Sequence, residues 1–156
     1  METRSYNVYS FAELTDEQKQ KAVENLWDIN VNYDWWDCTY DDANTVGLKI
    51  SGFDIDRGSY CTLSFINTDE DTATAILKNH GESCDTYSLA QAFLADLEKE
   101  IDEARQDDLS VDFLKALSDE YLSMLRTAYE YLTSEEVIIE TIDANAYMFT
   151  ENGDID

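Results

Sequence analysis

The sequence predicts an α+β fold in which a small antiparallel sheet packs with helices, including a long antiparallel helical hairpin. Three observations favour this class. Apolar residues recur at helical spacing over most of the chain. Strict alternation of apolar and polar residues is confined to short stretches near both ends and between residues 48 and 67. The chain also has no proline, which favours a large helical share.

The first third of the chain predicts one strand and two helices. Residues 5–10 alternate in polarity and are expected to form a short strand. Thr15, followed three residues later by Gln18, has the pattern of a capping box and begins a helix that ends near Asn30. A second helix is expected over residues 33–46. The residues of the first helix expected to be buried are Ala22, Val23, Leu26 and Trp27.

The middle of the chain predicts a hairpin and a short helix. Residues 48–67 form two alternating runs joined by a turn, with Gly52 at the position of a bulge. Either Thr68 or Asp69 is expected to cap a short helix that continues to Lys78.

The last third predicts two long helices, over residues 87–105 and 111–132. The link at residues 106–110 is short, so the two helices are expected to form an antiparallel hairpin. Ser134 is expected to cap a further helix, and residues 146–150 to form a closing strand in the same small sheet as the N-terminal strand and the hairpin.

Composition excludes several functional classes. The chain has 35 Asp and Glu against 10 Lys and Arg, a formal charge of -25, so direct binding to nucleic acid or to an anionic membrane is not expected. Three cysteines without a CxxC pair favour a reducing compartment, and no signal peptide or long apolar stretch is evident. We therefore expect a single acidic domain over residues 1–156, located in the cytoplasm, in which 44% hydrophobic residues build the core.

The acidic residues are the candidate partner-binding site. Net charges of -6, -7 and -12 over residues 1–50, 51–100 and 101–156 place the excess toward the C-terminus. Asp96, Glu100 and Glu103 follow the spacing of one helical stripe, and most acids lack a cation four residues away, although a solvated face is the alternative. Trp36 lies off the apolar stripe of its helix and is a candidate anchor. The remaining acids of the set are Asp107, Asp108, Asp112, Asp119, Glu120, Asp34, Asp37 and Asp41.

Three patterns with catalytic or metal-binding chemistry are weak. Asn67, Asp69 and Asp71 begin like a calcium loop, but the loop's glycine and its final glutamate are missing. His80 and Cys84 could pair as base and nucleophile, but Gly81 between them interrupts a helix that would align them. Glu17 and Lys19 resemble a nuclease pair but fall on a solvated helix face. No catalytic residue, no metal site and no cofactor is therefore expected, and we expect no enzyme.

Three motifs resemble small acidic proteins of phages and prophages. They are the string YSFAELTDEQKQKA at residues 9–22, YDWWD at residues 33–37 and GFDIDRG at residues 52–58. The resemblance covers roughly the first 66 residues. It implies an origin on a mobile element, and it supplies neither an activity nor functional residues.

The leading functional hypothesis is a phage-encoded inhibitor that mimics nucleic acid. Its partner would be a basic nucleic-acid-binding defence protein of the host, such as a CRISPR effector or a restriction enzyme, whose groove it would block. The alternative is a protein-binding module, an antitoxin or adaptor, that docks through aromatic and apolar contacts while the charge serves solubility. A homodimer is compatible with either hypothesis.

Overall fold

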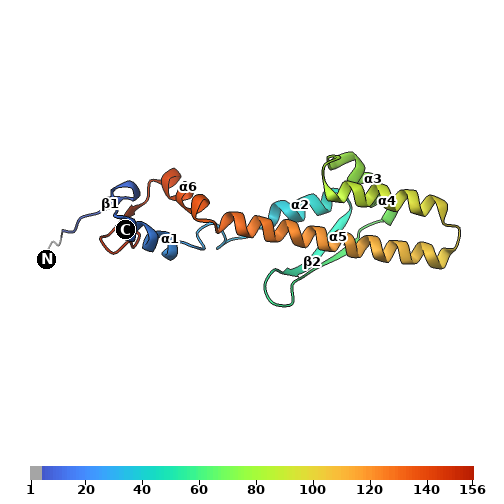
Figure 1. The fold of residues 1–156 in the computed structure, drawn as a ribbon, viewed down its shortest axis with the longest axis horizontal. Helices are drawn as coiled ribbons and strands as arrows, with labels where there is room; N and C mark the ends of the chain where they lie inside the picture. Colours follow the sequence, from blue (N-terminus) through green and yellow to red (C-terminus); the bar gives the residue numbers. More distant parts are fainter. Residues whose placement is uncertain (1–4) are drawn as a thin grey trace. The chain divides into compact units, whose positions relative to one another are not determined.

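The computed structural model describes residues 5–156, and this part of the chain forms six α-helices and two small antiparallel sheets (Figure 1). The α+β class is therefore confirmed. The described residues group into two compact units. The terminal unit combines the residues up to Trp35 with Ala128–Asp156, and the central unit is Trp36–Thr127. The prediction of a single domain remains a prediction.

The terminal unit brings the two ends of the chain together. Tyr9 pairs with Phe149 and Ser10 with Met148 in an antiparallel sheet. The edge of the Phe11 ring meets Phe149 with 6.1 Å between ring centroids, inside a core that also includes Ile138. The elements of this unit are β1 (Tyr9–Ser10), the 3₁₀-helix η1 (Phe11–Glu13), α1 (Asp16–Asn25), α6 (Glu135–Asn145) and β4 (Met148–Phe149).

The predicted caps of this unit are confirmed, and some of the predicted bounds are wrong. Thr15 and Gln18 form the capping box of α1. Ser134 caps α6. However, α1 ends at Asn25, and Trp27, expected to be buried, is 53% exposed. The chain after α1 forms turns, and the buried Asn30 amide at their end donates to the Leu132 carbonyl at 3.1 Å and accepts from the Thr141 hydroxyl at 2.8 Å.

The central unit surrounds a two-stranded hairpin. Its strands pair in antiparallel register from Leu48 opposite Phe65 to Asp54 opposite Tyr60, with the predicted bulge between Ile50 and Gly52. Thr68, one of the two predicted caps, caps α3. The elements are α2 (Asp37–Thr45), β2 (Leu48–Asp54), β3 (Tyr60–Phe65), α3 (Asp69–Asn79), α4 (Asp85–Lys99) and α5 (Glu103–Leu132), of which residues to Thr127 belong to this unit.

The strands divide between two sheets. Within residues 5–156, β1 pairs only with β4 and β2 only with β3. The predicted grouping of the terminal strands and the hairpin in one sheet is therefore corrected. Each pair has its own core: β2 and β3 bury Leu48, Ile50 and Leu63 in the central unit, whereas Phe149 is buried in the terminal unit.

The predicted helical hairpin is present as α4 and α5, which lie side by side and are joined by a tight connection at the right of Figure 1. The Phe93 and Phe113 rings stack across it with centroids 4.3 Å apart. The link is at residues 100–102, and the predicted link at 106–110 is wrong. Asp102 explains the difference, because its carboxylate accepts from the Ala104 amide at 3.0 Å and so caps α5.

Candidate acidic binding surface

The position of the link between α4 and α5 separates the residues of the predicted acidic stripe. Because α4 ends at Lys99 and α5 begins at Glu103, Asp96 and Glu103 lie on different helices, and the stripe formed by Asp96, Glu100 and Glu103 does not exist. Asp96 is exposed on α4. The predicted acids that are exposed on α5 are Glu103, Asp107, Asp108, Asp112 and Asp119.

The solvent face of α5 carries charges of both signs. At about 100° per residue, Asp108, Asp112 and Asp119 lie on the face opposite the buried Phe113, Leu117 and Tyr121. Lys115 and Arg126 lie on the same exposed face. This face is therefore acidic and also carries two cations.

Two of the predicted acids have contacts within the protein. The Glu100 carboxylate accepts from the Asp102 amide at 3.2 Å and pairs with Arg105 at 3.9 Å. Glu120 is half-buried, and burial, followed by the charges of Asp85 and Asp119, raises its pKa. The structure thus places Asp85 at the start of α4 beside Asp119 and Glu120 on α5, a proximity that sequence spacing does not reveal.

The predicted residues near α2 divide into exposed acids and a packed tryptophan. Asp34, Asp37 and Asp41 are exposed, the first in the terminal unit and the other two one turn apart on α2. Trp36 is half-buried and meets the Phe53 ring edge-on, with 5.8 Å between ring centroids. Trp36 therefore has a role in packing the central unit.

An acidic face on α6 was missed at the level of sequence. Glu136, Glu140 and Asp143 are exposed at intervals of four and three residues, opposite the buried Val137 and Ile138. Residues 128–156 contain eight Asp and Glu and neither Lys nor Arg. The absence of Lys and Arg after Arg126 was the sequence feature that could have indicated this acidic face.

Few of these carboxylates are neutralised by cations of the same chain. Among residues 5–156, Lys and Arg form a single ion pair with a carboxylate, Arg105 with Glu100. His80 and Asp42 are the other ion-pair geometry found there, with 3.0 Å between Nε2 and Oδ2. Most surface acids among these residues therefore have no Lys or Arg partner.

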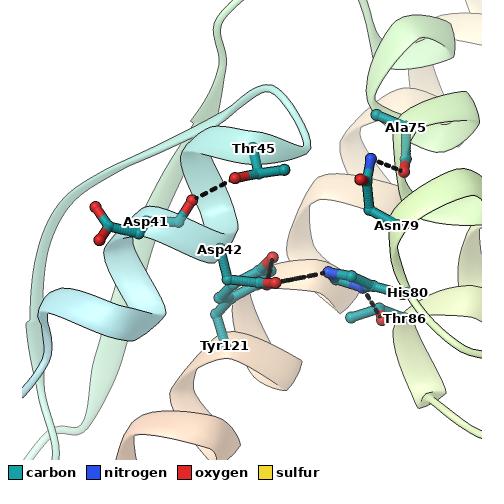
Figure 2. Close-up of polar contacts among 8 residues, drawn as sticks. All are labelled: Asp41, Asp42, Thr45, Ala75, Asn79, His80, Thr86 and Tyr121. Carbon is teal, nitrogen blue, oxygen red and sulfur yellow. Dashed lines mark hydrogen bonds and ion pairs between the residues drawn. The ribbon is translucent and has the colours of Figure 1, made fainter.

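A polar network in the central unit connects three helices and the segment between α3 and α4 (Figure 2). Asp42 of α2 accepts a hydrogen bond from the Tyr121 hydroxyl of α5 at 2.7 Å and contacts His80 Nε2 at 3.0 Å. His80 Nδ1 lies 2.6 Å from Thr86 Oγ1 at the start of α4. Burial, with the bond to Asp42, raises the pKa of Tyr121 above its usual range.

This network has the residue types of a catalytic triad but not its accessibility. Thr86 is 1% exposed, and the His80 side chain is 7% exposed. A carboxylate accepts hydrogen bonds, so the His80 ring donates to it through Nε2 and lies between Asp42 and Thr86. With a buried hydroxyl as its end point, the arrangement orders the helices and offers no nucleophile to a substrate.

The weaker sequence patterns are resolved by their positions. Thr68 and Asp69 lie at the start of α3, where the Thr68 hydroxyl accepts from the Asp71 amide at 3.0 Å. His80 faces Asp42 and Thr86, while Cys84 is exposed just before α4. In the described part of the chain, no group of three or more His, Cys, Asp or Glu side chains is arranged to hold a metal ion.

Comparison with known proteins gives no match to a family model, to a curated protein or to a solved structure. Among residues 5–156, no helix has both the length and the apolar character needed to cross a membrane.

Proposed function

We propose that this protein is a phage-encoded inhibitor that binds the basic, nucleic-acid-binding groove of a host defence protein in place of DNA or RNA. The observation that carries the proposal is the unneutralised charge: the chain has 35 acids and 10 cations, and residues 5–156 contain one Lys or Arg ion pair. Carboxylates without cations of their own are available to the Lys and Arg of a partner.

The mechanism is electrostatic and requires no bond chemistry. A charge of -25 attracts a positive channel over a distance comparable with the Debye length, about 10 Å at 0.1 M salt. On contact, carboxylates pair with the Lys and Arg side chains that otherwise hold phosphates. Occupation of the groove then excludes nucleic acid, and a CRISPR effector or a restriction enzyme would lose access to its substrate.

Helix geometry limits which acids can replace phosphates. Acids four residues apart on α5, such as Asp108 and Asp112, advance by about 6 Å along the helix. Phosphates on one DNA strand advance by about 3.4 Å per nucleotide. A single helix is therefore too sparse to imitate a strand, and the proposal needs Asp37 and Asp41 of α2 or Asp96 of α4 in addition.

The test is capture followed by competition. The protein, immobilised at low salt, is exposed to a bacterial lysate, and the captured protein is purified and its affinity measured against salt and against DNA and RNA. We expect a nucleic-acid-binding protein whose affinity falls steeply with salt and which nucleic acid displaces. Tight binding that salt does not change, or a partner that still takes up nucleic acid in the complex, would refute the proposal.

A second candidate function is favoured by exposed aromatic side chains. Trp27, Tyr33 and Tyr131 of the terminal unit are 53%, 58% and 60% exposed, and such residues are frequent anchors of protein interfaces. An antitoxin or adaptor would dock through them. Trp36, the anchor expected from the sequence, has a ring contact within its own unit, to Phe53.

Two sets of substitutions separate the candidates once a partner is captured. The first reverses four exposed acids of the central unit to Lys: Asp96, Asp108, Asp112 and Asp119. The second truncates Trp27 and Tyr33 to Ala. Groove mimicry predicts that the charge set abolishes binding and that the aromatic set has a small effect, and the adaptor function predicts the reverse.

A further inference from the structure

A surface groove follows α6 in the terminal unit. It consists of a hollow of about 580 Å³ lined by η1, α1 and α6, and of a shallow hollow of about 500 Å³ on the outer face of α6 that shares Glu135 and Ile139 with the first. We call this feature the α6 groove. Its remaining lining residues are Phe11, Asp16, Lys19 and Gln20 on one side and Glu136 and Glu140 on the other.

The α6 groove has an apolar floor and an acidic rim. Phe11 belongs to the core of the terminal unit and is 8% exposed, and Ile139 packs against the same core. Asp16 and Glu135 line the hollow that contains Phe11, and Glu136 and Glu140 line the adjoining face beside Ile139. A long cationic side chain has matching chemistry, because its methylene stem covers apolar surface while its charged end reaches carboxylates.

A cation of the protein itself already contacts the apolar floor of the α6 groove. The Lys19 ammonium lies over the Phe11 ring, 5.8 Å from its centroid, in a cation–π contact. Within residues 5–156, Lys19 forms no ion pair with Asp16 or Glu135, so the rim carboxylates keep their charge available. One cation therefore occupies a small part of the groove without neutralising it.

We propose that the α6 groove is the docking site for an arginine-bearing extended segment of a basic partner protein. The inference rests on the proposed function and names the element of the partner that is recognised. Arginine fits better than lysine because its planar guanidinium stacks on an aromatic face and pairs with a carboxylate through two donors. A second copy of the chain is disfavoured by a charge of -25 on each molecule, and the phosphates of nucleic acid are repelled by the same rim.

The first experiment measures binding of a fluorescent hexa-arginine peptide to the full-length protein at low salt by fluorescence anisotropy. The test variant is Glu135→Gln with Glu140→Gln, and the matched control is Glu82→Gln with Glu98→Gln, which removes the same charge from exposed positions of the central unit. We expect the test variant to lose affinity about tenfold, near the upper end for two exposed charge pairs. The control should lose about twofold or less, because it removes only distant attraction. Equal losses would overturn the proposal, since they would mean that only the total charge matters.

The second experiment does not depend on the stability of the rim variant. Lys19→Met removes the internal cation from above Phe11, and we expect the peptide to bind about two- to fivefold more tightly, because one competing cation–π contact is lost. In NMR titrations of the unsubstituted protein, the Phe11 ring and Ile139 methyl resonances should shift first. Unchanged affinity in Lys19→Met together with shifts confined to α5 would place the peptide elsewhere.

These outcomes are distinguishable from the test of the proposed function. If the captured partner is displaced by nucleic acid but the peptide does not distinguish the two double variants, inhibition by the acidic surface stands and the α6 groove is not its docking site. If the peptide binds in the α6 groove but no captured partner competes with nucleic acid, the groove recognises basic segments and the inhibitor function fails.

Discussion

Replacing Asp42 by Ala tests whether the polar network of the central unit stabilises the fold. In the native protein, Asp42 accepts from the Tyr121 hydroxyl at 2.7 Å and faces His80 Nε2 at 3.0 Å. The substitution leaves both donors without that acceptor. Tyr121 is 0% exposed, and the His80 side chain is 7% exposed, so neither reaches bulk water without a rearrangement.

The expected loss follows from the cost of unsatisfied donors. A buried donor without a partner costs about 1–3 kcal/mol. The Asp42 side chain is 42% exposed, so water can enter beside it and offset part of the loss. We therefore expect Asp42→Ala to lower the free energy of unfolding by about 2–4 kcal/mol, less than the full sum for two donors.

The neighbouring acid provides the control. Asp41 is exposed on the same helix, and Asp41→Ala should change stability by about 0.5 kcal/mol or less. Both substitutions alter helix propensity in the same way, so the difference between them isolates the network. The assay is urea unfolding followed by circular dichroism, with the stability compared at a common slope. A difference below about 1 kcal/mol would refute the reasoning.

A double substitution identifies the mechanism. Tyr121→Phe removes the hydroxyl that Asp42→Ala leaves unsatisfied, so the combined variant should be less destabilised than the sum of the two single variants. The interaction free energy between the positions should then be about 1 kcal/mol or more. Additive losses would mean that the Tyr121 hydroxyl finds another partner when Asp42 is absent.

Three further predictions concern alkaline pH, a helix cap and salt. Burial raises the pKa of Cys61 to about 11, so the folded state favours the neutral thiol. The free energy of unfolding should therefore be retained below about pH 9 and fall as the pH rises toward 11. Urea unfolding of Cys61→Ala should show a weaker decline over the same pH range. Asp102→Ala should cost about 1 kcal/mol as a lost cap of α5, against about 0.5 kcal/mol or less for Asp96→Ala, both measured by thermal unfolding. The melting temperature of the native protein should rise by several degrees from low to moderate NaCl because salt screens the repulsion among its acids, and a flat response would indicate that this repulsion is weak.

Local signals in the sequence predicted most of the elements. Thr15 and Ser134 were recognised as caps because a hydroxyl just before an amphipathic run has few other roles. Gly52 marked the bulge of the hairpin. The helical hairpin was predicted because two long apolar stripes flank a short connection, and the Phe93–Phe113 stack confirms that they face each other.

The position of the link could not be predicted, because local signals conflict there. Ile101 continues the apolar spacing of α4, yet it is 94% exposed. Asp102 caps the start of α5. In a chain with 35 Asp and Glu, the sequence alone does not show which aspartate is a helix cap. In the structure Asp107, Asp108 and Asp112 lie on a single helix, and the predicted stripe from Asp96 to Glu103 is absent.

The sequence predicted that the candidate site is an acidic surface, but it identified only some of the residues. Exposure of Asp96, Asp108, Asp112 and Asp119 agrees with the expectation of a solvent-facing acidic surface. The Asp42 side chain contacts His80 and Tyr121, which are remote from it in sequence. Helical periodicity does not predict a contact of this kind. The groove along α6 likewise requires η1 and α1 to lie beside α6, which only the tertiary structure provides.

The pairing of β1 with β4 has a consequence for biosynthesis. The central unit is contiguous in sequence, so a ribosome delivers all of Trp36–Thr127 before the last segment of the chain appears. The terminal unit cannot close until Met148 and Phe149 have been made, because they supply the partners of Tyr9 and Ser10. A nascent chain therefore carries its N-terminal segment unpaired through most of translation. Stalled or truncated products should retain the central fold and present the β1 segment to chaperones and proteases.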